Sequence, residues 1–215
     1  MEYLGEIIPV LLKATLKTIG YFGITLVLSL PIGWLLSLVR VSKKHRIAAK
    51  IVEIYTWVFR GTPLLLQLIF FYFAPSKLFG IAIPRFWAAI LAFVLNYAAY
   101  FCEIFRSGIE SIPVGQKEAA TILGFTKIQT FFHISLPQVI KRILPPMGSE
   151  CMTLVKDTAL AQTIGVAEMF RLAQTATTRE FSIVPIFVAG IFYLIMNGVV
   201  SVCFTHMEKR LSYYD

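Results

Sequence analysis

The stretch TIGYFGITLVLSLPIGWLLSLV, residues 18–39, contains no charged side chain. A helix needs about 20 residues to cross the hydrocarbon core of a bilayer, which is about 30 Å thick. The stretch is therefore long enough and apolar enough to span a membrane. It predicts that the chain is built around membrane-spanning helices.

The composition of the whole chain supports the same class. Hydrophobic residues make up 57% of the 215 residues and charged residues only 15%, whereas an ordinary soluble domain has about 25% charged residues. The net charge of +8 would suit nucleic acid if it formed one basic face. The Lys and Arg residues instead lie in short links between apolar runs, a distribution typical of membrane proteins. We therefore expect a multi-pass protein of the lipid bilayer and no nucleic-acid partner.

Four further runs are candidate spans: about 51–76, 84–103, 138–155 and 181–207. The run at 138–155 is the weakest, because Glu150 interrupts it. The prolines Pro31, Pro63, Pro145 and Pro146 lie within runs and predict kinks or breaks. The expected fold class is all-α, with about five transmembrane helices in a single domain over residues 1–215.

Charge bias predicts the orientation of the chain. The link at 40–50 holds five Lys and Arg residues. If this link is cytoplasmic, alternation places twelve Lys and Arg residues inside and seven outside. The positive-inside rule therefore predicts an external N-terminus and a cytoplasmic C-terminus.

One segment of the cytoplasmic loop at 107–136 has the features of a short helix. It reads PVGQKEAATILG from Pro113 to Gly124, with a proline suited to the first helical position and a glycine suited to a C-terminal cap. A helix of two to three turns is not stable alone, so it must pack on its own spans or on a partner. Ala119 and Ala120 would let another chain approach closely, and Glu118 would fix the register. An ordered loop with no partner is the alternative at this point.

A family resemblance follows from this segment. Glu118-Ala119-Ala120, Gly124 and the ISLP at 134–137 resemble the EAA motif of ABC-importer membrane subunits, E-A-A-x3-G-x9-I-x-L-P. FRGTPLLLQ at 59–67 and LVKDTAL at 154–160 resemble landmarks of the permeases for polar amino acids, the histidine/glutamate/glutamine/arginine/opine group. The resemblance implies a type I ABC importer permease fold in the inner (plasma) membrane of a bacterium. It also implies a coupling helix that docks on an ATPase through Glu118, Ala119, Ala120 and Gly124.

The implied assembly contains two permease subunits, as a homodimer or a heterodimer, two ABC ATPase subunits, an external solute-binding protein and an amino-acid substrate. The chain has no Gly-x4-Gly-Lys-Ser/Thr phosphate loop. ATP and Mg are therefore expected on the partner ATPase subunits, and this chain is expected to be a non-catalytic subunit without a cofactor. The three cysteines are far apart and show no metal-ligand spacing.

Ionisable and polar groups at membrane depth are candidates for contact with the substrate. Two sets share a helical face by their spacing, and we expect both faces to line one cavity: Asn96, Tyr100 and Glu103, and Glu150, Thr153 and Asp157. Carboxylates would meet a cationic amino acid such as arginine, lysine or histidine. Backbone N–H groups freed near residues 145–146 would meet the carboxylate of the substrate.

Two alternatives remain open at the level of sequence. Glu103 or Glu150 would instead clamp helices by pairing with Arg106, Arg142 or Lys156. A proton-coupled secondary transporter without an ATPase partner would also use membrane-embedded acids. That reading lacks support from an inverted internal repeat and gives the cytoplasmic loop no role.

Overall fold

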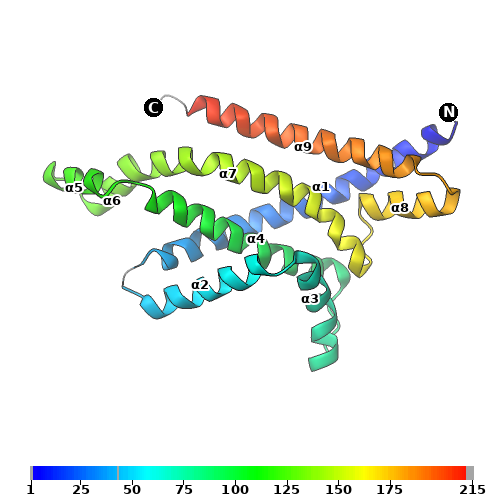
Figure 1. Ribbon diagram of the computed structural model, residues 1–215, viewed down its shortest axis with the longest axis horizontal. Coiled ribbons are helices and arrows are strands. Elements are labelled where there is room, and N and C mark those ends of the chain that lie inside the picture. Colours follow the sequence, from blue (N-terminus) through cyan, green and yellow to red (C-terminus); the bar gives the residue numbers. More distant parts are fainter. Residues whose placement is uncertain (1, 43, 212–215) are drawn as a thin grey trace.

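The protein is described by a computed structural model over residues 2–42 and 44–211, and every regular element within these ranges is helical. In chain order the elements are α1 (Glu2–Arg40), α2 (Arg46–Gly61), α3 (Leu64–Phe79), α4 (Arg85–Glu110), α5 (Val114–Ile122), α6 (Lys127–Gln129), the π-helix η1 (Thr130–Ser135), α7 (Leu136–Asp157), the 3-10 helix η2 (Thr158–Ile164), α8 (Met169–Glu180) and α9 (Val184–Arg210). Helices α1, α4, α7 and α9 run along the long axis of the molecule (Figure 1). Helices α5 and α6 lie at one end of this axis, and α8 lies at the other (Figure 1).

Helix α4 forms the centre of the bundle and packs against α1, α3 and α7. Its buried face is rich in small side chains, which allow neighbouring helices to approach closely. Gly33 of α1 lies at one such crossing. A Cβ atom on Gly33 would lie 2.8 Å from the Cβ atom of Phe101 and 3.0 Å from the carbonyl oxygen of Ala98, both on α4. The crossing of α1 and α4 therefore depends on a residue without a side chain.

The helices that can cross a membrane by length and composition differ from the expected set. Among the described residues, three qualify: 7–40 within α1, 85–110 in α4 and 184–210 in α9. The run expected at 51–76 is two helices, α2 and α3, which together are long and apolar enough for one span but meet at an angle of 106°. Helix α7, the expected fourth span, does not qualify because it carries five charged residues. It nevertheless runs beside α4 and α9 (Figure 1).

One of the four prolines expected to kink or break a run lies at a break between helices. Only Pro63 lies at a break, whereas Pro31, Pro145 and Pro146 lie inside continuous helices. Free backbone N–H groups were expected near residues 145–146, and this expectation is wrong. A proline removes a donor from its helix, so it frees a carbonyl oxygen four residues earlier and no N–H group. Helix α7 therefore offers no donor there to a substrate carboxylate.

A buried carboxylate fixes the start of helix α8. Glu168 is fully buried and accepts hydrogen bonds from the backbone N–H groups of Phe170 and Arg171, each at 2.6 Å. The hydroxyl of Tyr193, on α9, donates a third at 3.1 Å. Burial raises the pKa of the Glu168 carboxyl above its ordinary value, against the effect of these donors. Glu168 thus caps α8 and ties it to α9.

Candidate functional site

The break between α2 and α3 is held by side-chain amides. The Nε2 atom of Gln67 donates to the carbonyl oxygen of Phe59 at 2.9 Å and to the hydroxyl of Thr62 at 2.8 Å. The Nδ2 atom of Asn96, on α4, donates to the same carbonyl of Phe59 and to Oε1 of Gln67, each at 3.0 Å. These bonds satisfy polar groups that the end of α2 would leave unpaired. The segment at 59–67 is therefore a fixed corner, and Gln67 is its central hydrogen-bonding group.

An open cavity of about 490 Å³ lies between this corner, α4 and α7. Five of the six residues expected to face a substrate line it: Asn96, Tyr100, Glu150, Thr153 and Asp157. The remaining lining residues are Arg60, Gly61, Thr62, Pro63, Leu64, Leu65, Tyr97 and Leu160. The polar faces of α4 and α7 therefore meet in one cavity, whose volume is in the range of small-molecule sites.

The charges in the cavity come from three residues. Asp157 accepts a hydrogen bond from the hydroxyl of Tyr97 at 2.7 Å. Glu150 makes no ion pair within the described part of the chain. Arg60 is the one cationic residue in the lining. The hydroxyl of Thr153 donates to its own helix, at the carbonyl of Ser149, 3.1 Å away. The cavity thus presents two carboxylates and one guanidinium.

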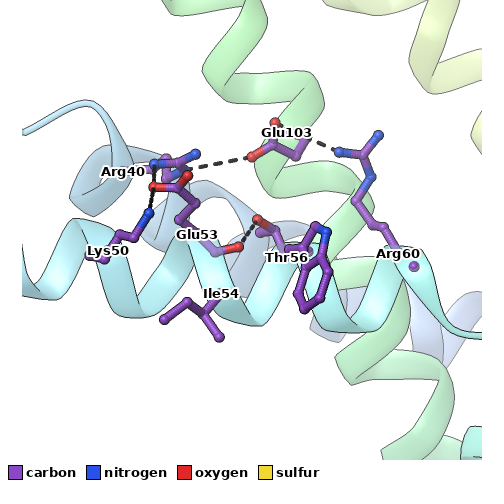
Figure 2. Close-up of a pocket in the computed structure, with 9 residues that line it drawn as sticks. Arg40, Lys50, Glu53, Ile54, Thr56, Arg60 and Glu103 are labelled. Carbon is purple, nitrogen blue, oxygen red and sulfur yellow. Dashed lines mark hydrogen bonds and ion pairs between the residues drawn. The ribbon is translucent and has the colours of Figure 1, made fainter.

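Glu103, the sixth expected residue, does not line this cavity. Its Oε2 atom accepts from Nη2 of Arg106 at 2.7 Å and from Nε at 3.0 Å. Guanidinium groups of Arg60 and Arg40 lie at 3.7 and 3.8 Å from its carboxylate, as Figure 2 shows for these two residues. Arg106 lies on the same helix as Glu103, so this pair does not join two helices, and the contacts of Glu103 with other helices are the longer ones to Arg40 on α1 and Arg60 on α2.

Glu103 also belongs to the wall of a second cavity, of about 660 Å³, between α1, α2 and α4 (Figure 2). Its other lining residues are Arg40, Lys50, Glu53, Ile54, Thr56, Trp57, Arg60 and Gly61. Arg60 and Gly61 are common to both cavities. The end of α2 therefore separates the two spaces.

Sequence reasoning missed Arg60 and Tyr97 as residues of the site. Arg60 carried a usable signal, since it is a charge inside an apolar run and directly precedes the Gly61-Thr62-Pro63 break. Tyr97 carried a weaker signal, because it lies three residues before Tyr100 and so near the same face of an isolated helix. Only the packing of α4 against α7 brings its hydroxyl to Asp157.

The short helix expected within the loop at 107–136 is present as α5, with Pro113 as its N-cap residue. Gly124 has a positive φ of 81°, and the N–H groups of Gly124 and Phe125 donate to the carbonyls of Thr121 and Ala120. This pair of bonds is a Schellman motif, which uses glycine because other side chains strain there. The expected cap is therefore present.

The exposed face of α5 differs from the expected one. Ala120 is buried within its own chain, so it is not open to a partner, whereas Glu118 and Ala119 are exposed. The exposed surface also includes Val114, Ile122 and Leu123, and Ile122 is 86% exposed. Exposed apolar side chains at the tip of a short helix are typical of a surface that contacts another protein.

A membrane-spanning helical bundle with a polar internal cavity and a short exposed helix at one end defines the transmembrane subunit of a transporter. The family model for binding-protein-dependent transport system inner membrane components matches residues 29–213. The chain belongs to this family.

Individual relatives cover nearly the whole chain. The arginine transport system permease protein ArtQ of Bacillus subtilis (strain 168) is 36% identical over 209 residues, which is 97% of this chain and 95% of the relative. The putative glutamine transport system permease protein GlnP of Rickettsia felis is 35% identical over 214 residues, 98% of both chains. A crystal structure of an amino acid ABC transporter with histidines matches with a TM-score of 0.89 and 29% identity, over 97% of both chains.

These matches confirm the resemblance inferred from the EAA motif, and with it the all-α permease fold. The chain is a permease subunit of an ABC importer and is not itself an enzyme, since ATP hydrolysis belongs to a partner ATPase subunit.

Proposed function

We propose that this permease subunit imports amino acids with a cationic side chain, such as arginine, lysine or histidine, and that the cavity between α4 and α7 holds them. The supporting observation is the charge of the cavity lining, two carboxylates against one guanidinium. An amino acid with a cationic side chain carries two positive groups and one carboxylate, which is the complementary set. Charges at membrane depth are costly unless they are paired, so a cationic substrate would stabilise both acids.

The names of the relatives support amino-acid import without fixing one substrate. Arginine and histidines occur in the names given above, but other relatives are named for glutamine, nopaline and L-cystine. The preference for a cationic side chain therefore rests on Glu150 and Asp157.

The assembly proposed here contains a second permease subunit, identical or related, two ATPase subunits that bind ATP and Mg, and an external solute-binding protein. In this arrangement α5 docks on an ATPase subunit. The proposed orientation has the N-terminus outside and the C-terminus in the cytoplasm. It is supported by the position of α5, the α1–α2 link and the end of α9 at one end of the molecule, opposite α8 (Figure 1).

The test compares two amino acids on the purified permease–ATPase complex in nanodiscs, without the solute-binding protein. Asp157→Asn and Glu150→Gln each remove one carboxylate. At least one of these variants should bind radiolabelled arginine about tenfold more weakly, because a hydrogen bond to a charged group is lost, while glutamine binding changes by less than about twofold. Glu53→Gln, which removes a carboxylate outside this cavity, is the matched control. Equal losses for arginine and glutamine in both variants, or no loss in either, would contradict the cationic preference.

A further inference from the structure

Arg60 lies at the boundary between the two cavities and is held loosely. Its guanidinium carbon lies 5.3 Å from the ring centroid of Tyr100, over the ring. Its Nη1 atom lies 3.7 Å from Oε2 of Glu103, and Figure 2 shows this pair. Within the described part of the chain its side chain makes no hydrogen bond, and it is 43% exposed. Its contacts are therefore long-range and easily exchanged.

Glu103 does not need Arg60 to remain paired. Two nitrogen atoms of Arg106 already donate to Oε2 of Glu103, at 2.7 and 3.0 Å. The other oxygen, Oε1, is buried without a hydrogen bond, and so is Nε of Arg40, 3.8 Å away. If Arg60 left, Glu103 would keep its closest partner and could approach Arg40.

A substrate α-carboxylate in the cavity needs hydrogen-bond donors. The neutral donors in the lining include the backbone N–H groups of Leu64 and Leu65, at the start of α3, and the hydroxyl of Tyr100. Glu150 and Asp157 carry the same sign of charge, and the prolines of α7 free no N–H group. The amide of Asn96 is already used at the corner of α2 and α3. A guanidinium presents parallel N–H groups that match the two oxygens of a carboxylate, and Arg60 is the one guanidinium in the lining.

We propose that Arg60 receives the α-carboxylate of the substrate, and that Glu103 holds Arg60 when the cavity is empty. Binding then exchanges one carboxylate partner for another and moves the Arg60 side chain, which forms part of the wall between the two cavities. Glu103 thus acts on the substrate through Arg60, as a positioning residue outside the cavity. This inference rests on one part of the proposed function, that the substrate is an α-amino acid, and does not depend on a cationic side chain.

The experiment measures equilibrium binding of radiolabelled arginine and of agmatine, the same molecule without its carboxylate, to the permease–ATPase complex in nanodiscs. Arg60→Gln should weaken arginine binding about tenfold and change agmatine binding by less than about twofold. Glu103→Gln should tighten arginine binding roughly two- to fivefold, because Arg60 no longer has to leave a partly exposed ion pair. Glu103→Gln in an Arg60→Gln background should have no further effect.

Glu180→Gln is the control for Glu103→Gln. Glu180, at the end of α8, pairs with Arg179 and lines neither cavity, so its removal should leave arginine binding unchanged. Arg60→Lys keeps the charge without the planar group, so it should lose less arginine binding than Arg60→Gln. This intermediate result would show that the loss in Arg60→Gln is not a failure of the complex to assemble.

Weaker or unchanged arginine binding in Glu103→Gln would overturn the proposal, as would equal losses of arginine and agmatine in Arg60→Gln. If the importer prefers a neutral amino acid, the same contrast applies to glutamine and its decarboxylated analogue 4-aminobutanamide. Failure of the cationic preference is therefore distinguishable from failure of the Arg60 assignment.

Discussion

Glu168 is a buried acid whose ionised form the fold disfavours on balance, although three donors contact it. A carboxyl whose pKa is raised on folding contributes stability that is fully present below its unfolded pKa of about 4.3, and that contribution is lost as the pH rises through the folded pKa. Glu168→Gln removes the titration and places a buried NH2 group where only acceptors are needed. The melting temperature of the native protein should exceed that of the variant by more at pH 5 than at pH 8.

Thermal melting of the purified subunit in detergent, at steps across this pH range, measures the difference. Glu118→Gln is the control, because Glu118 is exposed on α5. A gap between native protein and Glu168→Gln that widens as the pH rises would show that the ionised form is the stabilised one.

Individual site residues could be predicted where their spacing along one helix shows which face of the helix they share. The spacing of Asn96 and Tyr100, and of Glu150, Thr153 and Asp157, correctly indicated faces that line one cavity. The spacing of residues shows which face of a helix they share, but it does not show how far along that helix the cavity extends. Glu103 lies about 10 Å further along α4 than Asn96, at a rise of about 1.5 Å per residue, and so lies beyond the end of the cavity.

At the scale of helices, the close packing of α1 against α4 can be tested with two glycine substitutions in α1, one at the crossing and one away from it. In Gly33→Ala the new methyl group would meet the Cβ atom and backbone of α4, which cannot move aside cheaply. The variant should lose about 1–3 kcal/mol of stability, the usual cost of overpacking. Gly23→Ala, also in α1, meets nothing within 4 Å and should be neutral or slightly stabilising, because alanine favours helices. Melting temperatures of the two variants in detergent check this difference, and equal values would mean that the crossing is not close-packed.

Helix boundaries were predictable only in part. Each of the four prolines was expected to kink or break its run, and Pro63 lies at a break while Pro31, Pro145 and Pro146 lie inside continuous helices. The difference is local, because Gly61, Thr62 and Gln67 supply the flexibility and the hydrogen bonds that a sharp corner requires. Helix α1 begins at Glu2, well before the expected span, since Lys13 and Lys17 are good helix formers and do not end it.

For the whole molecule, the proposed docking of α5 on an ATPase subunit can be tested by one charge. Ile122→Asp places a carboxylate on an exposed apolar surface, so the purified permease should fold normally but retain at least about tenfold less ATPase subunit. Thr178→Asp adds the same charge to α8, at the opposite end, and is the control. Co-purification of the ATPase measures both variants. Full retention by Ile122→Asp would exclude this surface from the interface.

The polarity of α7 has a consequence for how the chain enters the membrane. A helix with five charged residues is a poor substrate for insertion as an isolated segment, since each charge near the centre costs roughly 2.5–3.5 kcal/mol on insertion scales. Helix α7 packs against α4, which is made before it, and against α9, which is made after it. The charged helix α7 can therefore reach its full packing only after α9 has been synthesised, so we expect the last helix to complete the insertion of this subunit.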